Sequence, residues 1–115
     1  MTYRFRLAAL VLFASTLAVS AEETGPVTAV ISHPVADYET WRKTYDAWAP
    51  MREAAGMTSA RVLHGPDDPN MIVLVHEFAS LDQARALFES AELKVAMKDA
   101  GVLAPPTITF GIPAD

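Results

Sequence analysis

The pattern of apolar positions centres on Met71 to Phe78 (MIVLVHEF), which follows the turn-forming residues 66–70 and precedes Ser80, a typical helix start. Eight residues are too few for a helix core, and the β-branched and aromatic side chains favour a strand. Apolar side chains occupy both alternating sets of positions, so neither side of this strand is expected to face water. The pattern therefore predicts a central strand.

Three shorter patterns predict the remaining strands. Residues 27–33 form an apolar run that ends at Pro34, which lacks the N–H group that a sheet needs. Residues 58–64 give a weaker pattern because Arg61 lies at their centre, whereas residues 107–112 alternate polar and apolar side chains. The turn after residue 64 joins the second strand to the central strand as a hairpin.

Two helices are predicted between these strands. Aromatic side chains recur at spacings of three and four over residues 38–55, which predicts a helix with one aromatic stripe. This stripe consists of Tyr38, Trp41, Tyr45 and Trp48. Pro50 is expected to kink or break the helix. A capping box from Ser80 to Gln83 predicts a second helix, which ends at Gly101 and can break near Ser90.

The order of elements is β-α-β-β-α-β, the ferredoxin-like arrangement of the α+β class, with a four-stranded antiparallel sheet and two helices on one face. The other face of the sheet is left bare. Five apolar side chains on that face would each lose about 1.5–3 kcal/mol by exposure, or roughly 8–15 kcal/mol together. This loss is as large as the net stability of a domain, so we expect a homodimer through the open sheet face, a dimeric α+β barrel.

The N-terminal residues have the pattern of a secretory signal peptide. Arg4 and Arg6 precede the apolar residues 7–19, and small residues follow where a cleavage site is expected. The apolar run is shorter than a membrane span, although an uncleaved anchor is the competing interpretation. We expect a signal peptide over residues 1–21, a polar leader over 22–26, a folded domain over 27–115, and a periplasmic or secreted protein.

Charge and composition exclude several classes of function. The net charge is −5, and removal of residues 1–21 would leave 7 basic against 14 acidic residues, a net charge of −7. Nucleic acid requires basic patches, so the acidic charge argues against nucleic acid as a partner. No membrane contact is expected after signal cleavage. The chain has no cysteine and no phosphate-binding, zinc or serine-hydrolase motif. We therefore expect neither a cofactor nor a metal.

His76 is the candidate catalytic residue because it interrupts the apolar central strand. If the hairpin pairs His64 opposite Met71, then Arg61 falls opposite Leu74 and shares a face with His76. The two side chains would then form a polar spot in an apolar cavity, where they could orient an oxygenated ring or receive a proton. A slip of one residue would separate them. Alternatively, His76 is a core or interface histidine that hydrogen-bonds a neighbour.

Four further side chains are candidates for substrate binding: Trp41, Tyr45, His33 and His64. The aromatic stripe packs on the sheet in the simplest interpretation, but Trp41 and Tyr45 could also form the wall of a site for a flat ligand. His33 and His64 end two parallel strands at the same end of the sheet, where they are either solvated or part of one site. No carboxylate accompanies them, which argues against a metal.

Several segments resemble the antibiotic-biosynthesis-monooxygenase-like proteins of the dimeric α/β barrel superfamily. These segments are residues 33–41 (HPVADYETW), 52–57 (REAAGM), 67–70 (DDPN) and 100–107 (AGVLAPPT). The resemblance implies the barrel fold over about residues 27–112. It also implies a cofactor-independent monooxygenase or cyclase-like activity. Monooxygenases of this superfamily often use an Asn, Trp and His group, but the single asparagine here, Asn70, is explained by the hairpin turn.

Two functional hypotheses follow. The first is an exported enzyme that acts on a small aromatic compound, with His76 and Arg61 as its polar groups and Trp41 as an apolar wall. The second is a non-catalytic, homodimeric periplasmic module for ligand binding or stress response. Related folds serve different reactions, so the resemblance does not decide between these two hypotheses.

Overall fold

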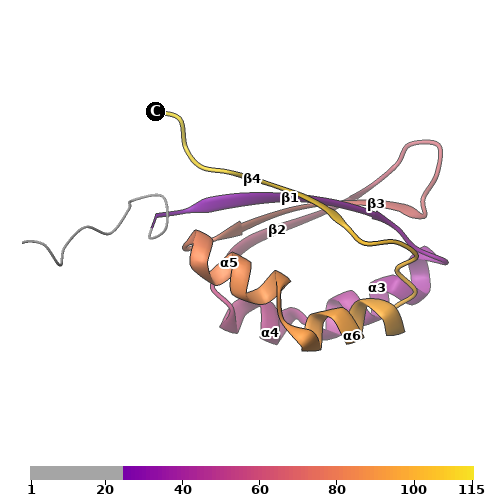
Figure 1. The fold of residues 1–115 in the computed structure, drawn as a ribbon. Coiled ribbons are helices and arrows are strands. Elements are labelled where there is room, and N and C mark those ends of the chain that lie inside the picture. The colour runs from indigo at the N-terminus through magenta and orange to yellow at the C-terminus, as the bar shows by residue number, and fades with distance from the viewer. Residues whose placement is uncertain (1–24) are drawn as a thin grey trace, which may run out of the picture.

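The computed structural model describes residues 25–115 (Figure 1). The predicted signal peptide, residues 1–21, and residues 22–24 of the predicted leader lie outside the described residues. None of the helices between residues 25 and 115 combines the length and apolar character needed to cross a membrane.

The four predicted strands form one antiparallel sheet in the order β2-β3-β1-β4. Their bounds are β1 Val27–Pro34, β2 Met57–His64, β3 Met71–Phe78 and β4 Thr107–Gly111. Strand β3 pairs with both β2 and β1, which confirms that the apolar stretch is an interior strand. The ferredoxin-like order of strands and helical crossovers is therefore confirmed.

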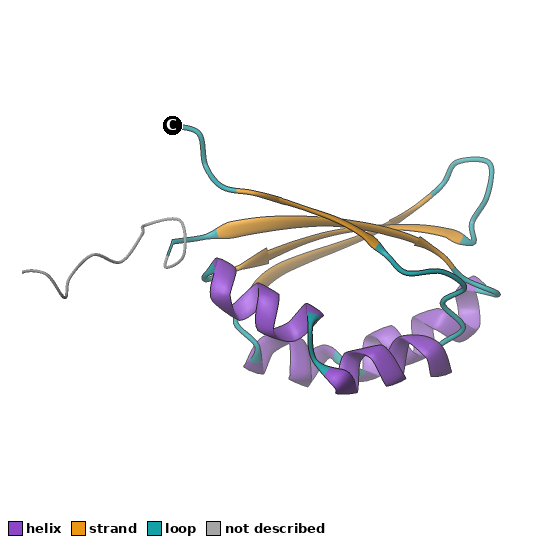
Figure 2. Cartoon of the chain, in the orientation of Figure 1, coloured by secondary structure: helices purple, strands orange, loops and turns teal. Residues whose placement is uncertain are grey.

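Each predicted helix consists of two shorter helices, so four helical segments lie on one face of the sheet (Figure 2). They are α3 Tyr38–Ala47, α4 Ala49–Ala54, α5 Leu81–Phe88 and α6 Ala91–Asp99. The first break follows from Pro50, which has no N–H group to continue α3 and instead lies in the first turn of α4. The second break occurs at Ser90, whose hydroxyl caps α6 by accepting a hydrogen bond from Leu93 N at 3.1 Å.

The core lies between this helical layer and the sheet. It consists of alternate residues of β1 and β3 together with buried side chains of α3 and α5, whereas α6 contributes no buried residue. The opposite face of the sheet has no helix over it within residues 25–115 (Figure 2). Val30, Leu63 and Met71 on that bare face are 42%, 39% and 38% exposed.

The hairpin register differs by one residue from the prediction. His64 pairs with Ile72 rather than Met71, and Arg61 therefore pairs with Val75. Since alternate residues point to opposite sides of a sheet, Arg61 lies on the bare face and His76 on the helical face. The turn sets this register, because Gly65 N donates a hydrogen bond to Met71 O at 2.9 Å and so places Gly65, rather than His64, opposite Met71. The prediction that Arg61 and His76 share a face of the sheet is therefore wrong.

Candidate functional site

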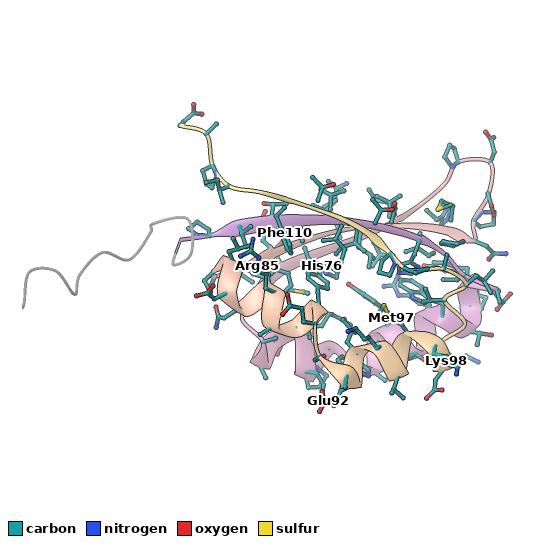
Figure 3. All side chains as sticks on the ribbon, in the orientation of Figure 1. His76, Arg85, Glu92, Met97, Lys98 and Phe110 are labelled. Carbon is teal, nitrogen blue, oxygen red and sulfur yellow. The ribbon has the colours of Figure 1, made fainter. Side chains whose placement is uncertain are left out.

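A cavity lies between the helical layer and the sheet, with about 80 Å³ of space for the centres of water-sized molecules. Both crossovers and the two interior strands contribute to its wall. His76 of β3 and Met97 of α6 lie on opposite sides of the space between the layers (Figure 3). The lining residues are Ile31, His33, Trp41, Thr44, Tyr45, Trp48, Arg52, Leu74, His76, Leu87, Phe88, Leu93, Ala96, Met97, Ala100 and Pro106.

Stacked rings form one wall of the cavity. The ring centroids of Trp41 and Tyr45 are 4.9 Å apart with an angle of 29° between the planes. The ring of His76 lies 5.9 Å from that of Tyr45 at 27°, and Tyr45 Oη is 2.9 Å from His76 Nε2. These three residues come from predicted positions, and the helix periodicity that defined the aromatic stripe explains why Trp41 and Tyr45 face the same strand.

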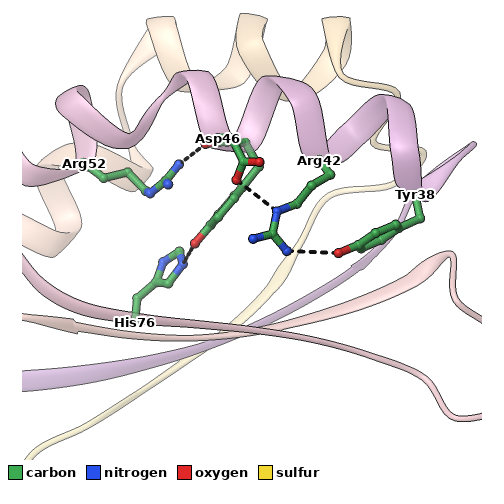
Figure 4. Close-up of polar contacts among 6 residues, drawn as sticks. Tyr38, Arg42, Asp46, Arg52 and His76 are labelled. Atoms are coloured by element: carbon green, nitrogen blue, oxygen red, sulfur yellow. Dashed lines mark hydrogen bonds and ion pairs between the residues drawn. The ribbon is translucent and has the colours of Figure 1, made fainter.

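Arg52 adds a positive charge to this wall. Its guanidinium carbon is 3.7 Å from the centre of the Tyr45 ring, and Nη1 donates a hydrogen bond to the backbone carbonyl of Tyr45 (Figure 4). Within residues 25–115 the only ion pair joins Arg42 to Asp46, so no carboxylate lies within ion-pair distance of Arg52. The side chain is half-buried, and its charge therefore acts on the cavity with less screening than a surface charge.

The cavity favours neutral forms of its titratable rings. Burial, with a smaller effect from the positive charge of Arg52, lowers the pKa of His76 to about 4. Burial also lowers the pKa of His33, while backbone groups of Pro34 and of His33 itself offset part of this change. Burial raises the pKa of the Tyr45 phenol. Near pH 7, His76 and Tyr45 are thus both uncharged.

Two histidine nitrogens have no hydrogen-bond partner among the described residues. They are the buried Nδ1 atoms of His33 and His76, and both histidines line the cavity. A neutral imidazole has one donor and one acceptor nitrogen, and in His76 the Nε2 atom is already engaged by Tyr45. Because an unpaired buried polar atom is unfavourable, a ligand oxygen that reaches Nδ1 would satisfy it.

The structure brings together four of the six candidate site residues. His76, Trp41, Tyr45 and His33 line the cavity, and the His33 ring lies edge-on to Trp41 at 5.9 Å. His64 does not line it.

His64 is exposed and packs against Tyr38, and its Nδ1 lies 3.0 Å from the carbonyl of Gly65. His33 and His64 both pair with Ile72, one on each side, which confirms that they lie at the same end of the sheet. Their rings contact different aromatic residues, since His33 packs against Trp41 and His64 against Tyr38.

Sequence reasoning missed Arg52 and the contribution of α6. Arg52 lies four residues after Trp48 and so continues the spacing of the aromatic stripe beyond Pro50, which is the signal that could have identified it. The α6 residues Leu93 and Met97 are also four apart and face the cavity together. Among the residues from 25 onwards, no three His, Cys, Asp or Glu side chains come together as metal ligands.

Comparison by sequence finds no matching protein-family model and no matching curated protein. Solved structures do match. A protein from Bordetella bronchiseptica assigned as an antibiotic biosynthesis monooxygenase gives a TM-score of 0.67 at 16% identity over 78% of this chain and 98% of its own. SnoaB, a cofactor-independent oxygenase from Streptomyces nogalater, gives 0.65 at 14% identity, covering 79% and 95%.

The ActVA-Orf6 monooxygenase of Streptomyces coelicolor, in complex with nanaomycin D, gives a TM-score of 0.58 at 24% identity, covering 80% of this chain and 90% of its own. At these identities the likeness concerns the fold, and it extends over nearly the whole length of each solved structure. This chain therefore shares the α+β fold of these antibiotic biosynthesis monooxygenase structures, as its resemblance to such proteins predicted.

Proposed function

We propose that this protein is a cofactor-independent monooxygenase that acts on a small hydroxylated aromatic compound. The observation that carries the proposal is the Tyr45–His76 pair, whose rings line a cavity walled by stacked aromatic side chains and in which the buried His76 Nδ1 has no hydrogen-bond partner among the described residues. The similarity in fold to SnoaB and to the ActVA-Orf6 monooxygenase supports the same class of reaction.

In this reaction the substrate supplies the electrons. The ring stacks on Trp41 and Tyr45, and its hydroxyl oxygen reaches His76 Nδ1. His76 Nδ1 accepts the hydroxyl proton, and a ring carbon of the resulting oxyanion gives an electron pair to O2 and forms a C–O bond. The peroxide then takes the proton from His76 and becomes a hydroperoxide. Loss of the ring proton and cleavage of the O–O bond release water and leave a quinone, so one oxygen atom enters the product and the other leaves as water. The protein orients the ring and excludes water.

The electrostatics of the cavity restrict the substrate. A pKa of about 4 makes His76 a weak proton acceptor near pH 7. Deprotonation by His76 is therefore slow for an ordinary phenol and faster for an activated phenol with a more acidic hydroxyl group. The positive charge of Arg52 in the same wall stabilises the resulting oxyanion.

The size of the cavity indicates that α6 moves when a ligand enters. An apolar cavity of about 150 Å³ accepts benzene, whereas this one has about 80 Å³. Helix α6 contributes no buried residue, and its Leu93 and Met97 form part of the cavity wall. Because methionine side chains adapt readily to irregular spaces, a displacement of α6 with a rotamer change at Met97 would enlarge the site.

Non-catalytic ligand binding is the second candidate function. The side chain of Asn70 accepts a hydrogen bond from Tyr38 N at 2.8 Å, so this asparagine supports the start of α3 and lies outside the cavity wall. Without an asparagine at the site and with a weakly basic His76, the cavity has fewer polar groups than an Asn, Trp and His site. This observation favours a protein that binds an aromatic ligand without oxidising it.

The test is oxygen uptake with 1-naphthol and with catechol, together with mass spectrometry of products formed under ¹⁸O2. We expect turnover with one labelled oxygen atom in the product, loss of turnover in His76→Ala, and unchanged turnover in Arg85→Gln, whose side chain is exposed on α5 and does not line the cavity. Saturable binding without oxygen uptake would support the non-catalytic function. If neither compound binds, both functions are refuted for this cavity.

We also propose that the protein is exported and acts as a homodimer. Export rests on the signal-peptide pattern of residues 1–21, and cleavage would leave a domain that begins near β1. The dimer rests on the bare face of the sheet, where exposed Val30, Leu63 and Met71 lie beside the half-buried Val73 and Val75. A second copy packed sheet to sheet would bury these side chains.

A further inference from the structure

Two arginines flank the Tyr45 ring, but only one of them is neutralised within the described residues. Arg42 Nε is 2.9 Å from Asp46 Oδ1, and Arg42 Nη1 donates to the Tyr38 hydroxyl at 2.9 Å (Figure 4). Its guanidinium carbon is 5.7 Å from the centre of the Tyr45 ring. Arg42 therefore has a carboxylate partner one turn further along α3.

Arg52 differs in both its position and its partners. Its guanidinium lies on the Tyr45 ring, and it lines the cavity. Of its five N–H donors, only Nη1 has a hydrogen-bond partner among residues 25–115, and that partner is the uncharged carbonyl of Tyr45. No carboxylate in that part of the chain forms an ion pair with Arg52, and Asp46 and Glu53 act on its charge only from a longer distance.

A half-buried guanidinium in an apolar wall is unfavourable unless an anion or strong acceptors accompany it. The chain as a whole has a net charge of −5, so long-range electrostatics do not attract anionic ligands. Any preference for an anion must come from local charge, and Arg52 is the arginine in the cavity wall. Its planar fork can bind two oxygen atoms of one carboxylate, or one phenolate oxygen, at a favourable geometry.

We propose that Arg52 forms an anion-binding subsite that makes the cavity selective for aromatic compounds bearing an oxyanion, as a ring carboxylate or an ionised phenol. The aromatic ring lies along Trp41 and Tyr45, and the oxyanion faces the guanidinium. This inference deepens the proposed function, because it rests on the cavity being the ligand site and names the charge of the ligand. Arg52 is a specificity determinant in this arrangement.

The experiment compares benzoate with benzamide, its uncharged isostere, by NMR titration of the ¹⁵N-labelled protein near pH 7. We expect benzoate to bind about 10-fold or more tightly than benzamide, because a hydrogen bond to a charged group contributes this much or more. In Arg52→Gln the ratio should fall to about 1 through loss of benzoate affinity, with little change for benzamide. Arg42→Gln is the matched control and should keep the preference, since Arg42 lies outside the cavity wall.

Arg52→Lys is a second variant that retains the charge while losing the planar fork, and we expect it to keep part of the preference. Circular dichroism of each variant checks that it folds. The proposal is overturned if the native protein binds the two compounds equally, if it fails to bind benzoate, or if Arg52→Gln keeps the preference.

These outcomes are separable from those of the proposed oxygenase. An Arg52-dependent preference for benzoate together with no oxidation of hydroxylated rings would refute the oxygenase and retain the anion subsite. Oxidation of 1-naphthol by a protein with no preference for benzoate would refute the anion subsite and retain the oxygenase.

Discussion

The pKa of His76 couples the stability of the domain to pH. Burial and the charge of Arg52 lower this pKa from 6.5 to about 4 in the folded state. Between these two values the unfolded chain binds a proton at His76 that the folded chain does not bind. Stability that is fully present above pH 6.5 is therefore lost as the pH falls towards 4.

The size of this effect follows from the two pKa values. Protonation of His76 in the unfolded state alone should destabilise the domain by about 2.5 kcal/mol between about pH 7.5 and about pH 4.5. This is a substantial part of the roughly 5–15 kcal/mol that stabilises a typical domain. The lowered pKa of His33 acts in the same direction, so the total loss in acid is larger.

The assay is urea unfolding of the native protein and His76→Gln at both pH values and at one protein concentration, followed by tryptophan fluorescence. Glutamine can keep a hydrogen bond to Tyr45 but does not titrate, so contributions from all other groups cancel in the comparison. We expect the variant to lose about 2.5 kcal/mol less than the native protein on acidification. Parallel losses, or a His76 NMR titration midpoint near 6.5 in the folded protein, would refute the reasoning.

Three further predictions concern two glycines with positive φ, the start of α3 and the bare face of the sheet. Gly56→Ala should destabilise the domain more than Gly101→Ala, although both positions have positive φ, 92° and 86°. At Gly56 a new Cβ would lie 2.6 Å from the end of the Gln83 side chain and displace it from its hydrogen bond with Ser80, whereas at Gly101 the nearest atom is Ala36 Cβ at 3.5 Å, an ordinary contact. Urea unfolding that ranks the two variants equally would contradict this. Asn70→Ala should lose about 1–3 kcal/mol of stability without changing ligand affinity, because it leaves the first N–H group of α3 unpaired; calorimetry and a benzoate titration check both parts. Val75→Lys on the bare face should convert a dimer to a monomer in analytical ultracentrifugation, and a monomeric native protein would exclude the proposed dimer.

The sequence was most informative where one strong pattern determined the structure. The bounds of β3 are those predicted, because an eight-residue apolar run between a turn and a helix cap has few alternative structures. The break at Pro50 follows from the chemistry of proline itself. His76 could be recognised as a candidate because it is polar at an inward-facing position of an otherwise apolar strand, whereas Glu77 points to the other side.

Prediction failed where two signals of similar strength competed. In β2 both alternating sets mix polar and apolar residues, so hydrophobicity does not fix the register, and the turn after His64 decides it. A β-bulge between Met57 and Ser59 changes the register only at the start of β2. Arg61 was consequently assigned to the wrong face. Arg52 was overlooked because an arginine beyond a helix-breaking proline usually lies on the surface, and its position on the Tyr45 ring depends on how α4 packs.

Helix α6 separates the shape of the cavity from the stability of the fold. Ala96 and Met97 line the cavity and are only partly buried, so substitutions there change the wall that a ligand meets while the core of β1, β3, α3 and α5 stays intact. Leu93, by contrast, also packs against that core. Mutations that alter a binding site are commonly limited by the stability they remove. Here that limit is weak on the α6 side of the cavity, so a protein with this fold can acquire new ligands through substitutions in one short helix.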